Sequence, residues 1–217
     1  MCWIGTQCSA EVSAGQLTSR MKQETGCLRN VSLVCCIQTF TAASKPNIAV
    51  RAGFMYLGGA EEAMHHSTLK ALGINSVLNA SDNVEHFELN NPDMRYYRVA
   101  VGDFPNWAER IADRLEGAVD WAEQQRKEGR RVLVHCKMGM SRSTTCVLGW
   151  MLKYGAMPDG KRWKLRDAFL HVKARRNVAN PNPGFLNELC RWEMHIHGKS
   201  SVATFGQDEV REVKEVA

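Results

Sequence analysis

Hydrophobic and polar residues alternate in the periods of strands and helices through the middle of the chain, from about residue 47 onward. Short runs rich in β-branched and aromatic residues predict strands. The predicted strands are Ala49 to Leu57, Ile74 to Asn79, Met94 to Val101 and Val132 to Val134. The last of these is apolar at every position, which is typical of a strand buried on both faces of a sheet.

Apolar residues that recur every three or four positions predict helices between and after these strands. The predicted helices cover residues 61–72, 106–128, 143–154, 165–172 and 183–196. Gly73 and Gly129 stand where a helix commonly ends, because glycine takes the left-handed conformation without strain. Asn182 can cap the last helix, since Pro183 suits a first helical position. The helix over 143–154 is apolar on nearly every side and is expected to be central.

The order of these elements predicts an α/β fold. Strands interleaved with helices, followed by three further helices, indicate a small mixed central sheet flanked by helices. The pattern divides the chain into a weakly patterned extension, one domain and a polar tail, over residues 1–46, 47–198 and 199–217. The extension carries a short apolar patch at 31–37 that is too short to form a domain.

Composition limits the class of protein. Of 217 residues, 44% are apolar and 24% are charged, an ordinary mixture that excludes collagen, wholesale disorder and coiled coils. No apolar run is long enough for a transmembrane helix, which needs about 18 residues or more. The net charge of +5 is too small and too dispersed to predict nucleic-acid binding, although it suits anionic substrates.

Eight cysteines are expected to be thiols, since the first residues lack the features of a signal peptide. No pair of them has the spacing of a zinc site, so no metal is expected. Palmitoylation of Cys2, or of Cys35 and Cys36, is the alternative to idle or buried thiols. These features predict a cytoplasmic protein, with a nuclear location as the alternative. The sequence does not indicate an oligomeric state.

The stretch from His135 to Ser143 carries the most informative chemistry. It lies between the predicted strand at 132–134 and the central helix, and a strand–loop–helix junction directs several backbone amides toward one point. The loop residues expected to contact an oxyanion such as phosphate are Lys137, Met138, Gly139, Met140, Ser141 and Arg142. Gly139 permits the turn, and the guanidinium of Arg142 can hold two phosphate oxygens.

The same junction suits Cys136 as a nucleophile. A helix N-terminus and a nearby guanidinium favour the thiolate over the thiol. A thiolate beneath a bound phosphate implies phosphoryl transfer to sulfur. Ser143 can donate its hydroxyl to Cys136 when the thiolate leaves. His135 is expected to bond loop carbonyls and order the loop, with a direct acid–base role as the less favoured alternative.

The string His-Cys-x-x-Gly-x-x-Arg-Ser, here His135 to Ser143, resembles the signature of the cysteine-dependent protein tyrosine phosphatase superfamily. Its form with Ser141-Arg142-Ser143 is similar to the dual-specificity branch. The resemblance covers about residues 47–197, including Asn180 to Leu186 before the last helix. It implies a protein tyrosine phosphatase-like fold, a metal-independent and cofactor-free hydrolase, and phosphoprotein substrates. Residues 1–46 are too few for the docking domain of larger relatives, which suggests a small atypical member.

The resemblance also implies a general acid, an aspartate about 30 residues before the cysteine. Asp103 matches, since it lies 33 positions upstream of Cys136 and follows a predicted strand. A poor alkoxide or phenoxide leaving group needs that proton. Asp82 and Asp93 are competitors that do not share the family spacing.

Several alternatives stay open from the sequence. A phosphatase of the same superfamily could act on phosphoinositides, glycans or RNA 5′ phosphates. Lipid-directed relatives tend to have two lysines in the loop, whereas this loop has only Lys137. A non-catalytic phosphate-binding module is the second alternative. Cys146 could trap oxidised Cys136 or simply pack in the core, and the basic stretch 161–164 could touch substrate or face solvent.

Overall fold

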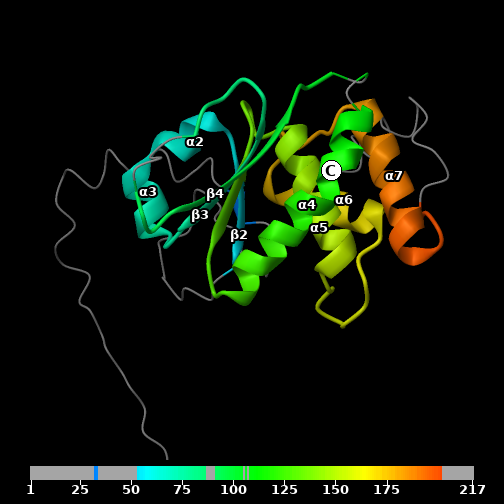
Figure 1. The fold of residues 1–217 in the computed structure, drawn as a ribbon. Helices are drawn as coiled ribbons and strands as arrows, with labels where there is room; N and C mark the ends of the chain where they lie inside the picture. The colour runs from blue at the N-terminus through cyan, green and yellow to red at the C-terminus, as the bar shows by residue number, and fades with distance from the viewer. Residues whose placement is uncertain (1–31, 34–52, 87–90, 105, 107, 202–217) are drawn as a thin grey trace, which may run out of the picture.

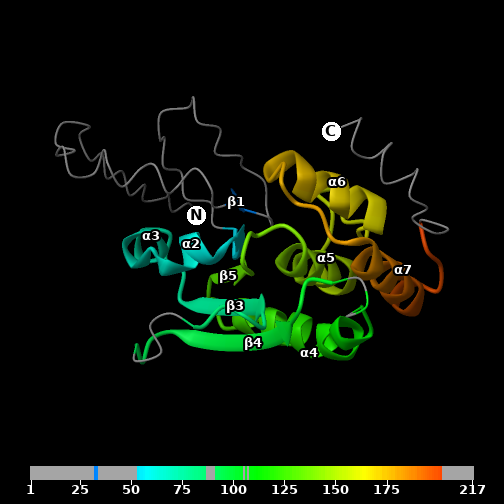
Figure 2. The same cartoon turned by 90° about the horizontal axis from the view of Figure 1, so that it is seen from above.

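The computed structural model of the chain describes residues 32–33, 53–86, 91–104, 106 and 108–201. A central sheet separates two groups of helices (Figures 1 and 2). On one face lie α2 (Ala60–Met64) and α3 (His66–Ala71). On the other face lie α4 (Ala108–Lys127), α5 (Arg142–Tyr154), α6 (Leu165–Arg175) and α7 (Pro183–His197). The expected α/β arrangement, a small mixed sheet flanked by helices, is confirmed.

The sheet of the described residues has five strands in the order β1-β2-β5-β3-β4. The strands are β1 (Ser32–Leu33), β2 (Met55–Gly58), β3 (Ser76–Ser81), β4 (Arg95–Val101) and β5 (Val132–His135). Strands β2, β5, β3 and β4 are parallel, and β1 runs antiparallel to β2. The carboxyl ends of the four parallel strands therefore meet along one edge, where ligands bind in open α/β sheets.

Successive side chains of a strand point to opposite faces of the sheet, so the apolar residues of the strands are divided between two cores. Leu133 of β5 and Tyr56 of β2 face α2 and α3 in the smaller core. Val132 and Val134 face the larger core formed with α4 to α7. Strand β5 is buried at all four positions, so the prediction of a strand covered on both faces is confirmed. Among the described residues no helix is both long and apolar enough to cross a membrane.

The prediction of one helix over residues 61–72 is wrong, because the chain breaks at His65 into α2 and α3. The physical reason lies in which residues are buried. Ala63 and Thr68 would lie about 140° apart around a continuous helix, yet both are buried. The break at His65, whose φ is −87° and ψ is 83°, changes the direction of the chain, and Ala63 and Leu69 on either side of it both pack in the smaller core.

The predicted helix ends are confirmed at three places. Gly73 and Gly129 have φ of +65° and +71°, each two residues after the end of its helix, α3 or α4. The Asn182 side chain accepts a hydrogen bond from the Phe185 amide at 3.0 Å, which caps α7. The predicted extension contributes β1 within its apolar patch, and its other residues, with the N-terminal cysteines, lie outside the described residues.

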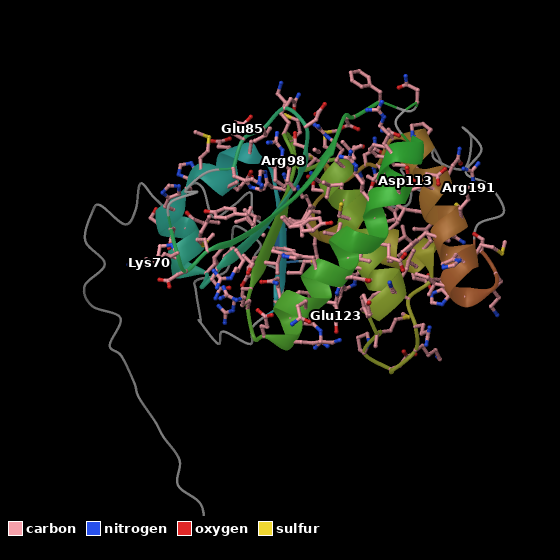
Figure 3. The ribbon with its side chains drawn as sticks, in the orientation of Figure 1. Lys70, Glu85, Arg98, Asp113, Glu123 and Arg191 are labelled. Atoms are coloured by element: carbon pink, nitrogen blue, oxygen red, sulfur yellow. The ribbon has the colours of Figure 1, made fainter. Side chains whose placement is uncertain are left out.

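A buried carboxylate ties α4 to α5, the helix that begins at the candidate site. Glu123 is labelled on α4 in Figure 3 and is 5% exposed. It accepts hydrogen bonds from Trp150 Nε1 at 3.2 Å and from Arg126 Nε at 2.8 Å. Burial raises the pKa of Glu123, but hydrogen bonding and charge from Arg126 and the bond from Trp150 outweigh burial. The pKa of Glu123 is therefore lowered.

A carboxylate with a lowered folded-state pKa stabilises the fold above its unfolded pKa of about 4.3, and this contribution is lost as pH falls. Glu123→Gln is expected to lower the free energy of unfolding by about 1–2 kcal/mol at neutral pH. The difference from wild type should shrink toward zero as pH falls below that unfolded value, because the native carboxyl, whose pKa is lowered, then protonates as well. Urea unfolding of wild type and Glu123→Gln from neutral to acidic pH measures this difference in the free energy of unfolding. Glu128→Gln, which changes a carboxylate that is 44% exposed, is the control. An equal deficit at every pH would contradict a stabilisation that depends on the charge of Glu123.

Candidate active site

Cys136 follows the last residue of β5 at the carboxyl edge of the sheet and is fully buried. Its Sγ accepts two hydrogen bonds, from the Gly139 amide and from the Ser143 hydroxyl, both at 3.2 Å. Ser143 lies in the first turn of α5, so the positive end of that helix is directed at the sulfur. Two donors and a helix N-terminus form an environment that stabilises negative charge on Sγ.

The carbonyl groups of the loop point away from the sulfur. The carbonyl of Lys137 accepts from the Ala60 amide at 3.0 Å, and that of Met140 accepts from the Asn180 amide at 2.9 Å. Arg176 donates to the other two, through Nε to Gly139 O at 2.8 Å and through Nη2 to Met138 O at 3.1 Å.

In a trans peptide the carbonyl and the following amide point in opposite directions. Because four successive carbonyls are bonded outward, the amides of residues 138–141 are directed inward, toward Sγ. The Gly139 amide that bonds Sγ is one of them. The loop is therefore a concave surface of amide donors, which matches a tetrahedral oxyanion.

Gly139 is required for this loop conformation. Its φ is +67°, in the left-handed region that favours glycine. A Cβ built at this position would lie 2.5 Å from Arg176 Nη2 and 2.6 Å from the Gly58 carbonyl carbon. Any side chain would thus displace either β2 or the arginine that holds the loop carbonyls.

Arg142 presents one edge of its guanidinium to the loop. Its Nη1 donates to Ser81 Oγ, Asp82 Oδ1 and Val101 O, each at 3.1 Å. These bonds hold the side chain, which is 4% exposed, against the ends of β3 and β4. Its Nε is buried and makes no hydrogen bond within the described part of the chain. A buried guanidinium N–H with no partner is costly, and an oxygen of a bound phosphate would satisfy it.

Asp103 follows β4 and lies across the mouth of the loop. Its Oδ1 accepts from Ser141 Oγ at 2.6 Å and from Asn182 Nδ2 at 3.0 Å. Its Oδ2 lies 3.7 Å from Arg142 Nε. The side chain is about one-third exposed, at 34%. Asp103 is therefore held beside Ser141 and Arg142 of the loop while part of its carboxylate stays accessible to solvent.

The other acidic residues considered from the sequence are placed differently. Asp82 is bonded to Arg142, so it orients the guanidinium. Asp93 precedes β4, at the amino end of the sheet, where its carbonyl accepts from Arg130. Asp103 differs from both in its bonds to Ser141 of the loop and to Asn182, which hold it across the mouth of the loop.

His135 and Cys146 are buried beside the loop. The Nδ1 of His135 lies 3.3 Å from the Cys136 carbonyl oxygen. Burial lowers the pKa of His135 to about 4, against the opposing effect of that hydrogen bond, so the ring is neutral at neutral pH. Burial, with the charge of Cys136 second, raises the pKa of Cys146 to about 12. Its thiol stays protonated and packs in the larger core.

The remaining predicted loop residues differ in exposure. Lys137 and Met138 are exposed at the rim, Met138 at 63%, whereas Met140 is half-buried and Ser141 is buried. The backbones of Lys137, Met138 and Met140 are held by outward bonds, and the Ser141 hydroxyl contacts Asp103.

Several residues that hold the site together cannot be identified from the sequence. These are Ser81, Arg176 and the side chain of Asn182, for which the sequence predicts only a capping role. The site's organisation depends on contacts between segments that are 37 to 79 positions apart, such as Asn182 with Asp103. Among the described residues, no three His, Cys, Asp or Glu side chains gather as metal ligands.

Comparison with known proteins identifies relatives of this arrangement. A family model described as the dual specificity phosphatase catalytic domain matches residues 55–195. Mouse dual specificity protein phosphatase 14 is 34% identical over 148 residues, which are 68% of this chain and 70% of that protein. Human dual specificity protein phosphatase 1 is 35% identical over 144 residues, which are 66% of this chain and 36% of that protein.

Two solved structures of dual specificity phosphatases are similar to this chain in fold. The crystal structure of human DUSP28 is 30% identical, with a TM-score of 0.58, and the match covers 66% of this chain and 90% of that chain. A mouse putative dual specificity phosphatase, crystallised with zinc tungstate, is 28% identical with a TM-score of 0.60 and covers 75% of this chain and 96% of that chain.

The chain spans about a third of the length of several curated relatives, between 28% and 36% for the Dictyostelium discoideum, rat and human proteins that it matches. The region shared with the family model contains Cys136, Arg142, Asp103 and Asn182. The protein tyrosine phosphatase-like fold expected from the sequence is thus confirmed, and the chain belongs to the family of dual specificity phosphatase catalytic domains.

Proposed function

We propose that the chain hydrolyses phosphate monoesters on tyrosine, serine and threonine side chains of proteins through a phosphocysteine intermediate. One observation carries the proposal. The sulfur of Cys136 accepts two hydrogen bonds inside a loop of inward amides, beside an Arg142 Nε that has no hydrogen-bond partner among the described residues. A nucleophile and an oxyanion cradle thus share one position, as phosphoryl transfer to sulfur requires.

In the first step the Cys136 thiolate attacks phosphorus, and the bond between phosphorus and the substrate oxygen breaks. The loop amides and Arg142 stabilise the charge on the phosphoryl oxygens. Asp103 donates a proton to the leaving oxygen. Since its Oδ1 already accepts from Ser141 and Asn182, Oδ2 is the oxygen that carries this proton.

In the second step water attacks phosphorus, and the bond between phosphorus and sulfur breaks. The Asp103 carboxylate takes a proton from that water, reversing its first role. The Ser143 hydroxyl, 3.2 Å from Sγ, stabilises the departing thiolate. His135, neutral and buried behind the loop, orders the backbone of Cys136 and takes no part in proton transfer.

Protein substrates are favoured over phosphoinositides by the side chains of the loop. A phosphoinositide carries several phosphates, which demand several cations around the one being hydrolysed. The loop supplies only Lys137 besides Arg142, and its other exposed side chain is the apolar Met138. The shallow cleft expected from the sequence depends on residues 47–59, of which 47–52 lie outside the described residues.

The role of Cys136 predicts the behaviour of a serine variant. Cys136→Ser should keep the fold and bind phosphorylated substrate, while kcat falls at least about a thousandfold, because a hydroxyl has no comparable anion population. Steady-state kinetics with an aryl phosphate measures this loss. Cys190→Ser, which makes the same change in α7 away from the loop, is the matched control and should retain full activity. Retained turnover in Cys136→Ser would exclude the mechanism.

The role of Asp103 predicts a dependence on the leaving group. Asp103→Asn should lower kcat by about 10²- to 10⁴-fold for esters of basic alcohols, and much less for esters of very acidic phenols. Asp82→Asn should instead lower kcat/KM for all substrates by a similar factor, because Asp82 contacts Arg142 and not the leaving group. A series of aryl phosphates distinguishes the two patterns. A uniform loss in Asp103→Asn would remove this residue as the general acid.

Substrate class is tested by comparing matched phosphotyrosine and phosphothreonine peptides with short-chain phosphoinositides in one buffer. Both peptides should be hydrolysed, with kcat/KM above that of the lipids. A preference for the lipid of a hundredfold or more, about 2.7 kcal/mol of transition-state discrimination, would assign the chain to lipid phosphates.

A further inference from the structure

The connection between α5 and α6 places two basic residues on either side of a buried tryptophan. Arg162 forms a β-bridge with Ala156, and the Met157 amide donates to the Lys161 carbonyl at 2.7 Å. Trp163 is buried, whereas Arg162 and Lys164 on either side of it are exposed. The alternation of the extended backbone thus anchors the segment through Trp163 and directs both cations outward.

These side chains line a cavity of about 710 Å³, which we call the basic pocket. The connection forms one wall, the first turn of α6 the second, and the end of α7 the third. The basic residues that line it are Arg162, Lys164, Arg166, His197 and Lys199. Its volume lies within the range of roughly 300–1,000 Å³ that is typical of ligand pockets.

The basic pocket lies at the opposite end of the helices from Cys136. Arg176, just after α6, contacts the loop of residues 137–142, and Asn182, just before α7, contacts Asp103. The pocket is formed by the start of α6 and the end of α7, near the yellow connection at the foot of Figure 1. With 11 residues, α6 spans about 16 Å, which approximates the distance between the two sites.

The pocket has an excess of positive charge without internal partners. Arg162, Lys164, Arg166 and Lys199 form no ion pair with any other described residue. The buried Nε2 atom of His197 also makes no hydrogen bond within the described residues.

The two carboxylates in the pocket do not balance these cations. Glu193 is 1% exposed, and it accepts from the Leu165 amide at 2.8 Å and from the Ser201 amide at 2.7 Å. Its charge is therefore used to cap α6 and to hold the chain after α7. Among the described residues, Asp167 is the only other acidic residue that lines the pocket, against four cations.

We propose that the basic pocket is a second substrate-binding site, which takes an acidic peptide segment of the phosphoprotein. This inference rests on the proposed function. Cations on three walls fit several carboxylates spaced along a peptide, and the cavity is larger than a single phosphate requires. A hollowed site fits an inserted peptide better than the flat surface of a membrane, which would reach only the rim.

The separation of the two sites predicts the arrangement of the substrate. An extended chain spans at most about 3.3–3.6 Å per residue, so the acidic segment must lie at least about five residues from the phosphorylated side chain. The pocket should lower KM for such substrates and leave kcat unchanged, because it contacts no reacting atom.

Direct binding tests the pocket independently of catalysis. A fluorescein-labelled, unphosphorylated peptide rich in glutamate and aspartate is titrated with the full chain, and anisotropy is recorded at rising NaCl. Arg162→Glu and Lys164→Glu should each raise Kd about tenfold, since each reversal removes an attraction and adds a repulsion. Lys70→Glu, an equal charge change at the exposed α3 position labelled in Figure 3, should leave Kd unchanged.

Kinetics then links the pocket to the proposed reaction. For a phosphopeptide joined to an acidic segment, both pocket variants should raise KM about tenfold, while kcat and the hydrolysis of a small aryl phosphate stay at wild-type values. Unchanged peptide binding in the variants, an equal effect of Lys70→Glu, or binding only to anionic lipid vesicles would overturn the pocket assignment. A wild-type chain that binds the acidic peptide but cannot hydrolyse the aryl phosphate would instead overturn the proposed function and leave the pocket standing.

Discussion

The loop of residues 137–142 can turn its amides inward only because other segments bind its carbonyl groups on the outside. An isolated loop would gain nothing from this arrangement, since each outward carbonyl left without a partner in a buried setting is costly. The start of α2 supplies one donor, the segment before α7 supplies another, and Arg176 supplies two. The buried Glu62 supports the same region, since its Oε2 accepts from the Gly59 amide at 2.7 Å. Much of the fold around the sheet edge thus serves to orient one short stretch of backbone.

The sequence is most informative where function depends on neighbours in the chain. One short segment between a strand and a helix contains Cys136, Gly139, Arg142 and Ser143. Their spacing alone indicates a thiol at the start of a helix. Strand β5 is equally clear, because an uninterrupted apolar run between basic residues is typical of a strand buried on both faces. The whole domain is organised around this strand and the helix after it, so the fold class follows from the same short region.

The parts that sequence could not predict are set by contacts between distant segments. Nothing near Arg176 indicates that its guanidinium reaches back to residues 138 and 139. Asn182 carries a clear capping pattern, which conceals its second bond to Asp103. The break at His65 is hidden for a related reason. Residues 61–72 have the pattern of a helix, but a single helix could not bury the residues that are buried on both sides of His65. In each case tertiary contacts decide between options that the local sequence leaves equal.

The contact of Asp103 with Ser141 and Asn182 joins three segments that have separate stabilities. Proteins open locally, and helix ends open at a lower free energy than central strands do. The first turn of α7 belongs to the former class, and β5 with its thiol belongs to the latter. Partial opening at α7 would break the bond from Asn182 to Asp103, and leave the bond from Ser141, before it disturbed the sulfur. A form opened in this way would keep the thiol and the amide donors in place while Asp103 is held by fewer bonds, so under the proposed mechanism proton donation would weaken before attack by sulfur does.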